Sequence, residues 1–411
     1  MTTGAKNWAG NVVFSAERLE APSSVERLRE VVADTAKVHV VGAGHSFSRI
    51  ADTTGTLISL RNLPNTVEVT PDRTSVRVAA GLRLGEIATR LHAEGLALHN
   101  LPSLPHITVA GAVATATHGS GDANGSLASA VRSLDLMTAD GKLTTLSRGD
   151  ERFAGAVVSL GSLGVVTALE LDVVPAFDME QRVHEELPWP VLVERSAELF
   201  AQAYSVSVFT DWRDTFAAWV KRRTTDAPAE LAWTGAREAT GQRHPIPGVS
   251  AEYCTRQLGE PGPWHDRLPH FRAEFTPSAG DELQSEYVVP RTRTAEALRA
   301  LKELGSVISP VLLVSEIRTV DADEFWLSPF YRRRSTGLHF TWKPDTAAVR
   351  PVLRQIEEAL APYSVRPHWG KLHEDVPAHR FEHWSRFARL RDEVDPFGKF
   401  RNEVVDAFYQ S

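Results

Sequence analysis

Apolar residues recur at helical spacing near the beginning of the chain. Positions 25, 28, 31 and 32 are valine or leucine, and they begin within Ser23–Glu26, whose Ser-x-x-Glu pattern is typical of a helix capping box. Leu84, Ile87 and Leu91 indicate a second helix, which we expect to end at Gly95. Between and after these helices, short apolar runs predict strands at Val38–Val41, Ser75–Ala79, Leu134–Ala139, Leu143–Ser147 and Val165–Val174.

The pattern changes after Pro175. Aromatic residues become frequent there, and residues 244–264 form a Pro/Gly-rich stretch that predicts long loops. Further strands are predicted at Glu282–Val289, Leu312–Val320 and Gly337–Trp342, with helices at Ala295–Leu304 and Ala347–Leu360. This arrangement predicts an α+β fold with domain boundaries near residues 175 and 365.

Composition narrows the function classes. A chain of 411 residues is long enough for two or three domains, and its net charge of −7 argues against a nucleic-acid partner. The single cysteine, Cys254, excludes an intramolecular disulfide and a thiolate metal cluster. The first residues do not resemble a signal peptide, and no apolar run approaches the ~20 residues that span a bilayer. We therefore expect a cytoplasmic protein without membrane contact.

The stretch Val38–Ser48 runs from an apolar strand into a glycine turn. Gly42-Ala43-Gly44 matches half of a dinucleotide fingerprint, but Phe47 stands where its third glycine would be, so the Rossmann interpretation is weak. Two glycines can still turn successive backbone N–H groups toward a phosphate without side-chain clashes.

A second segment, residues 107–124, has almost no bulky side chain. Small residues there allow a flat ligand or a pyrophosphate to lie against the backbone. Close packing of a strand on a helix, or a flexible loop, would explain either segment alone. Two such segments in one domain, one of them with a histidine in its turn, favour a dinucleotide cofactor.

Several motifs together resemble the vanillyl-alcohol-oxidase-type flavoproteins, and within them the alditol oxidases most closely. The motifs are GxGHSF, PSLPHITVAGAVATxTHGSG, SLGVVT, HWGK and DPxGxFxN, and the similarity extends over nearly the whole chain. The resemblance implies an FAD-binding domain formed by residues 1–175, completed by residues 366–411. It also implies a cap domain over residues 176–365 with a large antiparallel sheet.

The resemblance assigns the turn histidine, His45, to a covalent bond with the flavin. A neutral imidazole is a competent nucleophile toward the flavin's methyl carbon. Without the resemblance, His45 would be interpreted as a helix cap or a phosphate ligand. The other cofactor contacts implied by the resemblance are Val41, Gly42, Ala43, Gly44, Ser46, Phe47, Ser103, Thr108, Gly111, Thr115, Ala116, Thr117, His118, Val166 and His368.

Polar or charged residues alternate with apolar residues on two predicted strands. Glu316 and Arg318 are two residues apart and therefore share one face of a strand, as do His339 and Thr341. A Glu/Arg pair of this kind is usually a cross-sheet salt bridge on a solvated face. Here the apolar neighbours at 311–314 indicate a more buried position.

The resemblance implies a polyol substrate such as xylitol or sorbitol. It gives Ser103, Gln284, Glu316, Arg318, Thr341 and Lys371 as substrate-binding residues. His339 is the expected base, while Arg318 and Lys371 hold the reacting hydroxyl and stabilise developing negative charge. A lining of several fixed donors and acceptors suits a substrate with several hydroxyls.

Oxygen is the expected electron acceptor and hydrogen peroxide the product. The residue before Ser103 is Pro102, and glycine or proline at this position is common among oxidases of the superfamily. Alditol oxidases typically carry alanine there. We expect a monomer without a metal ion.

Three alternatives stay open at this point. The nearest is an aldonolactone oxidase or dehydrogenase of the same superfamily, against which the SEIRT and HFTW segments argue. A non-catalytic flavin- or sugar-binding protein is the second. A metal hydrolase using His368, His373 and His379 is the third, although their spacing matches no standard zinc motif.

Overall fold

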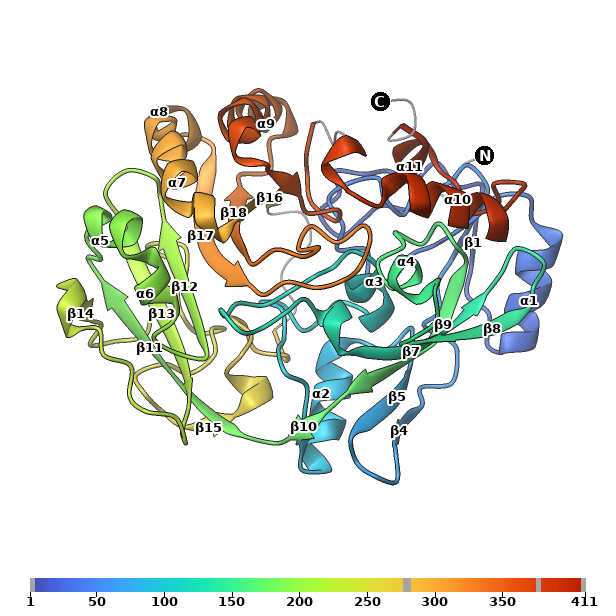
Figure 1. Ribbon diagram of the computed structural model, residues 1–411, viewed down its shortest axis with the longest axis horizontal. Coiled ribbons are helices and arrows are strands. Elements are labelled where there is room, and N and C mark those ends of the chain that lie inside the picture. The colour runs from blue at the N-terminus through green and yellow to red at the C-terminus, as the bar shows by residue number, and fades with distance from the viewer. Residues whose placement is uncertain (1–3, 276–281, 375–377, 408–411) are drawn as a thin grey trace.

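The computed structural model describes residues 4–275, 282–374 and 378–407. The parts of the predicted domains that fall at 1–3, 276–281, 375–377 and 408–411 lie outside the described residues. Figure 1 shows an elongated molecule in which the chain forms one half, crosses to the other, and returns. None of the helices in the described part of the chain combines the length and the apolar character needed to cross a bilayer.

The first half contains a small parallel sheet and a capped helix. Its strands β1 (Arg18–Glu20), β3 (Thr56–Ile58) and β2 (Val38–Val40) lie in that order, beside helix α1 (Val25–Asp34). The predicted helix is confirmed, but its cap is Ser24 rather than Ser23. The Ser24 hydroxyl accepts a hydrogen bond from the backbone N–H of Arg27 at 3.1 Å, as an N-cap side chain does.

A second sheet forms the base of this half. Its antiparallel strands follow the order β4 (Val67–Val69), β5 (Ser75–Ala79), β9 (Val165–Asp172), β7 (Val131–Met137) and β8 (Leu143–Ser147). The four predicted strands in this set are confirmed within two or three residues. Helix α2 (Leu84–Ala93) is also confirmed, and Gly95 follows it at φ +71°. The short helix α4 (Phe153–Ala156) lies near β8 (Figure 1).

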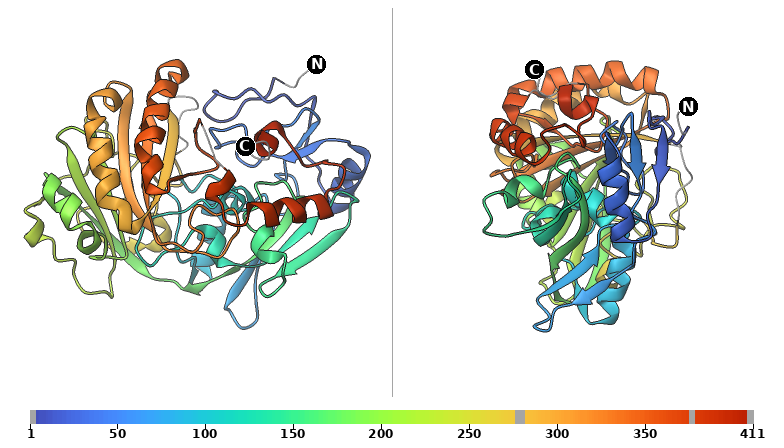
Figure 2. Two further views of the ribbon diagram at one scale, coloured as in Figure 1. Left: turned by 45° about the horizontal axis from the view of Figure 1, so that its top comes forward. Right: turned by 90° about the vertical axis from the view of Figure 1, so that its right-hand side faces the viewer.

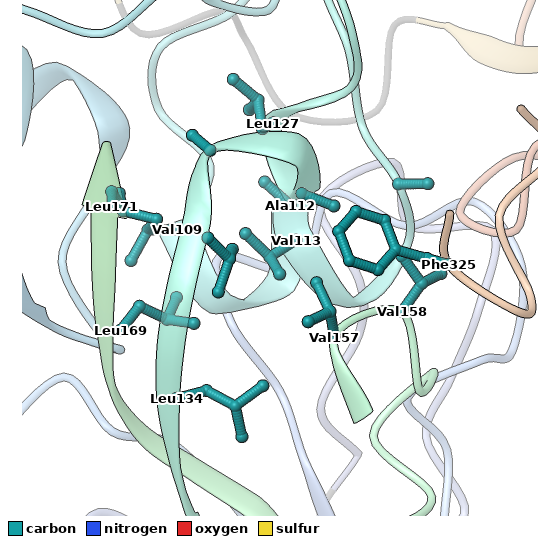
Figure 3. Packing of buried hydrophobic residues seen from close by; sticks show 14 of the residues in the cluster. Val109, Ala112, Val113, Leu127, Leu134, Val157, Val158, Leu169, Leu171 and Phe325 are labelled. Carbon is teal, nitrogen blue, oxygen red and sulfur yellow. The ribbon is translucent and has the colours of Figure 1, made fainter. Parts of the chain in front are cut away.

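Helix α3 (Val109–Ala114) comes from the segment of small residues and packs against the second sheet. Its Val109, Ala112 and Val113 are buried among leucines of β7 and β9, as Figure 3 shows. The close-packing interpretation of this segment is therefore correct for its apolar side chains. The remaining small residues leave the other side of α3 open to a ligand.

The chain enters its second half through β10 (Val174–Pro175), which pairs with β6 (Leu96–Ala97). The described residues of that half form a nine-stranded antiparallel sheet. Its order is β14 (Arg237–Glu238), β11 (Asp178–Glu185), β13 (Phe216–Arg223), β12 (Ser205–Thr210), β17 (Leu312–Val320), β18 (Ser335–Trp342), β16 (Leu283–Pro290) and β19 (Arg366–Pro367), and β15 (Gly262–Pro263) also pairs with β11. The sequence patterns predicted β16, β17 and β18 but missed β11, β12 and β13.

The two faces of this large sheet differ in chemistry. One face carries apolar residues such as Ile317, Leu338 and Phe340, which pack beneath helices α5 (Trp189–Glu194), α6 (Ser196–Phe200), α7 (Thr294–Glu303), α8 (Gly305–Ile308) and α9 (Thr346–Leu360). Figure 2 shows α7 and α9 side by side over that face. The residues that alternate with these apolar residues along the strands, including Glu316 and His339, are also buried and point to the opposite face of the sheet. That face is turned toward the first half of the molecule.

The C-terminal segment returns to the first half. Helices α10 (Trp384–Val394) and α11 (Glu403–Ala407) lie beside the N-terminal region (Figure 1). Between them, the Lys399 carbonyl accepts from the Val38 N–H at 2.9 Å, and the Asn402 amide donates to the Ile50 carbonyl at 2.9 Å. These contacts hold the strand that leads into the glycine turn.

Candidate active site

A deep cleft lies between the two halves of the molecule. Its walls are the glycine turn, α3 and the polar face of the large sheet, and they border about 1460 Å³ of empty space, a volume that includes open solvent. Nearly all predicted site residues line it, namely Val41, Gly42, Ala43, Gly44, His45, Ser46, Phe47, Ser103, Thr108, Gly111, Thr115, Thr117, His118, Gln284, Glu316, Arg318, His339, Thr341, His368 and Lys371. Residues separated by more than 300 positions in sequence therefore meet in one cavity.

Two predicted cofactor residues do not line the cleft. Ala116 is fully buried in the core next to α3, with a left-handed φ of +53°. Val166 is half-buried on β9 and packs against the cluster beneath α1. The Ala116 side chain is therefore enclosed by the core, whereas the Val166 side chain is partly exposed.

The glycine turn approaches the start of α3 very closely. A Cβ atom at Gly42 would lie 2.2 Å from the Thr108 hydroxyl, and one at Gly111 would lie 3.0 Å from it. Both glycines keep backbone accessible on the cleft wall, where a side chain would fill the space. A backbone-lined wall at one end and a charged wall at the other suit an elongated dinucleotide such as FAD.

His45 is held in the turn by the N-terminal segment. The Asn7 amide donates to the Ser46 carbonyl and the Asn11 amide to the Phe47 carbonyl, both at 2.9 Å, and the Trp8 N–H donates to the Gly44 carbonyl. The Trp8 ring lies 5.0 Å from the imidazole of His45. Burial, assisted by the charge of Lys371, lowers the pKa of His45 to about 4. The imidazole is therefore neutral at neutral pH, as a nucleophile must be.

The charged residues of the sheet form a buried network rather than a solvated salt bridge. Arg318 donates to both oxygens of Glu286 at 3.1 to 3.2 Å, and its Nη1 lies 3.7 Å from Glu316. Although burial opposes ionisation, Arg318 and His118 hold the pKa of Glu286 well below its usual range. Burial also opposes ionisation of Glu316, but Arg318 and His270 lower the pKa of this carboxyl group. The two carboxylates thus flank one guanidinium group.

Within the part of the chain that the structure describes, His118, Glu286 and His368 have a spacing that could suit a metal ion. One possible ligand atom from each lies within 4.8 Å of the others. Arg318, however, already donates to both oxygens of Glu286, so a cation there would face a fixed positive charge.

Gln284 connects the predicted base to the predicted cation. Its carbonyl oxygen accepts from the ammonium group of Lys371 and lies 3.2 Å from Nε2 of His339. Burial and the charge of Lys371 lower the pKa of His339 to about 3, and burial lowers the pKa of Lys371 to about 8. With Nε2 donating to Gln284, Nδ1 of His339 is the atom that can accept a proton.

Among the cleft residues that were not predicted are Glu286, Trp8 and His270. Glu286 lies two positions after Gln284 on β16, so the same alternation that indicated Glu316 and Arg318 would have found it. Trp8 and His270 come from loops, where no periodicity marks the side chains that face a ligand.

Comparisons with known proteins agree with this geometry. Residues 16–147 match the FAD binding domain family, and residues 281–408 match the D-arabinono-1,4-lactone oxidase family. The structure of cholesterol oxidase from B. sterolicum superposes with a TM-score of 0.78 over 99% of this chain and 97% of that one. At 16% sequence identity this likeness shows the fold alone, and it confirms the predicted α+β fold.

Two relatives carry the assignment further. The L-gulono-1,4-lactone dehydrogenase of Mycobacterium tuberculosis is 29% identical over 97% of both chains. The alditol oxidase of Streptomyces sp. is 49% identical over 98% of this chain and 99% of its own. Identity at this level over the full length confirms the resemblance seen in the motifs. The chain therefore belongs to the alditol oxidase family of FAD-dependent oxidoreductases.

Proposed function

We propose that this protein oxidises the terminal primary hydroxyl of a polyol, such as xylitol or sorbitol, to the aldose. The observation that carries the proposal is the polar face of the large sheet. Gln284, Glu316, Arg318, His339 and Thr341 project from three adjacent strands into the cleft, and Lys371 joins them from the C-terminal side. These donors and acceptors match a chain of hydroxyls, whereas an apolar alcohol would leave them unpaired.

We also propose that FAD occupies the wall built from the turn and α3, and that it is bonded to His45. When bound, FAD accepts a hydride from the alcohol carbon. Residues 1–175 and 366–411 then serve as the cofactor domain and residues 176–365 as the cap. Acid precipitation followed by mass measurement of the peptide containing His45 tests the bond. Flavin released into the supernatant would contradict it.

The proposed roles of the reacting residues follow from their contacts. Arg318 and Lys371 bind the reacting hydroxyl and lower its pKa, and Nδ1 of His339 takes its proton. Because His339 is a weak base, the proton moves only as the hydride leaves. The Ser103 hydroxyl can donate to or accept from the other hydroxyls of the substrate, and the Glu316 carboxylate accepts from them.

The direct test is anaerobic addition of xylitol to the purified yellow protein. We expect the flavin absorbance to bleach and to recover in air with formation of hydrogen peroxide. An unchanged spectrum with every polyol would support a non-catalytic binding protein.

A lactone oxidase or dehydrogenase is the second candidate, favoured by the family match over residues 281–408. Bleaching by a γ-lactone but not by xylitol would establish it.

The rate of flavin reoxidation in air also tests the role of Pro102. If proline at this position slows oxygen access, Pro102→Ala speeds reoxidation without changing the rate of bleaching. We propose a monomer, which light scattering can test.

A further inference from the structure

A buried lysine lies behind the polar face of the cleft. Lys221 is on β13 and is only 2% exposed. Its ammonium group donates to the carbonyls of Leu268 and Pro269, the latter at 3.1 Å, and lies 3.3 Å from Nδ1 of His270. A protonated lysine has three N–H donors, and three acceptors surround it here. The contacts therefore match the charged form, although burial lowers the pKa of Lys221 to about 7.

This contact determines the tautomer of His270. In its charged form the lysine can only donate, so the facing Nδ1 carries its lone pair and Nε2 carries the proton. Nε2 lies 3.1 Å from Oε1 of Glu316 and donates to it. The rings of Phe209 and Trp219 contact the imidazole edge to face at 5.3 and 5.5 Å and fix its orientation. Burial and the charge of Lys221 lower the pKa of His270 to about 4, which leaves it with one proton.

The chain of contacts ends at a residue of the cleft. Glu316 receives the His270 N–H on Oε1, while its Oε2 lies 3.7 Å from Arg318. The carboxylate is thus held between two donors with lone pairs left for a ligand hydroxyl. His270 also donates its backbone N–H to the Ser103 carbonyl at 3.1 Å, so the loop is tied to the opposite wall.

We propose that Lys221 and His270 are positioning residues, which hold Glu316 as a hydrogen-bond acceptor for a substrate hydroxyl remote from the reacting carbon. The inference rests on the proposed function and extends it to residues that touch no reacting atom. A purely structural network is the alternative. Burying a lysine costs free energy, however, and the contacts of Lys221 lead through His270 to Glu316, whose side chain faces the cleft.

Removing Lys221 has a specific consequence. Nδ1 of His270 then loses its donor, and the imidazole is no longer held where Nε2 donates to Glu316. A displaced imidazole would release the carboxylate and weaken binding of the hydroxyl. The hydride step of bound substrate depends on other residues and would change little.

The test uses the FAD-loaded protein and anaerobic flavin reduction at varied xylitol concentration. The variants are Lys221→Met, His270→Leu and His270→Gln, and Lys343→Met is the control. Lys343 is exposed and donates to the Pro310 carbonyl, so its loss removes a similar bond away from the cleft.

We expect Lys221→Met and His270→Leu to raise the half-saturating xylitol concentration about tenfold or more, as for a lost hydrogen bond to a charged group. The limiting rate of reduction should fall no more than about threefold. His270→Gln should stay near wild type, because its amide N–H can replace the donor to Glu316. Lys343→Met should match wild type.

Unchanged half-saturation in Lys221→Met and His270→Leu would overturn the inference. So would a His270→Gln protein as impaired as His270→Leu, since the donor would then be irrelevant. If Lys221→Met does not fold, the comparison of His270→Leu with His270→Gln still tests the inference. A wild-type protein that no polyol reduces overturns the proposed function and this inference with it, and that failure is recognised before any substitution is made.

Discussion

Arg318 and Glu286 form an ion pair that bridges over the strand between them. Arg318 is on β17 and Glu286 is on β16, and β18 separates these strands. The pair closes above Gly337 of β18, where a Cβ atom would lie 2.9 Å from Oε1 of Glu286 and 3.6 Å from Cγ of Arg318. Both side chains are buried, so the guanidinium group is held in the cleft by a partner that water cannot replace.

Glu286→Gln tests what this ion pair contributes. The substitution leaves the guanidinium with Glu316 alone, and we expect about 3 kcal/mol loss in the free energy of unfolding. We also expect kcat/KM for polyols to fall about 100-fold, because Arg318 would shift from the reacting hydroxyl. Denaturant unfolding and steady-state kinetics measure the two effects.

Glu324→Gln is the matched control for this substitution. Glu324 pairs with Arg332 at 2.8 Å, but both side chains are more than 60% exposed. Loss of such a surface pair should cost about 1 kcal/mol or less and leave kcat/KM unchanged. Equal effects of the two substitutions would contradict a special role for Glu286.

Gly337→Ala tests the same ion pair without removing either charge. The added methyl group would displace the carboxylate of Glu286, and overpacking of this kind costs about 1 to 3 kcal/mol. We expect kcat/KM to fall about tenfold while FAD stays bound. Gly85→Ala is the control, since its Cβ would make an ordinary 3.4 Å contact with Pro105. Full activity in Gly337→Ala would show that the pair tolerates rearrangement.

Four of the predicted site residues share a local pattern. Glu316 and Arg318, and His339 and Thr341, alternate with apolar residues on their strands, and period-two alternation indicates a common face. The same reasoning extends to Glu286, which follows Gln284 by two positions. The register of β16, β17 and β18, which brings these pairs together, depends on hydrogen bonds between distant segments and leaves no local signal.

Strands β11 and β12 were missed for two different reasons. β12 is buried at all six positions, so it shows no alternation, and β11 carries five charged or histidine residues among eight. Lys221 and His270 are 49 residues apart, and nothing in either segment indicates the other. The domain boundaries at 175 and 365 stay a prediction from the change in sequence pattern.

Lys371 should impose an alkaline limit on catalysis. Its pKa is lowered from the usual value to about 8, so the ammonium form that stabilises the developing negative charge exists below pH 8 and is lost above it. We therefore expect kcat/KM for xylitol to fall as pH rises through about 8. Lys371→Arg should lower the plateau but move this limit to higher pH, because arginine keeps its proton. An unmoved limit would assign the ionisation to another group.

Asn7 should control how much flavin becomes bonded to His45. The Asn7 amide donates to Ser46 at 2.9 Å and to Asn11 at 2.7 Å, and its carbonyl accepts from the Val12 N–H at 3.0 Å. Asn7→Ala removes these bonds and frees the turn that presents the imidazole, at a cost of about 1 to 3 kcal/mol in unfolding free energy.

We expect the fraction of flavin that stays with the protein after acid precipitation to fall severalfold in Asn7→Ala, with total FAD reduced much less. The control is Asn62→Ala, because exposed Asn62 donates to the Ala21 carbonyl at 3.1 Å, and neither residue belongs to the glycine turn. A shortfall that FAD addition and longer incubation fully restore would indicate slower bond formation by a misplaced imidazole. A fully bonded flavin in freshly purified Asn7→Ala would instead mean that the glycine turn presents His45 without help from the N-terminal segment.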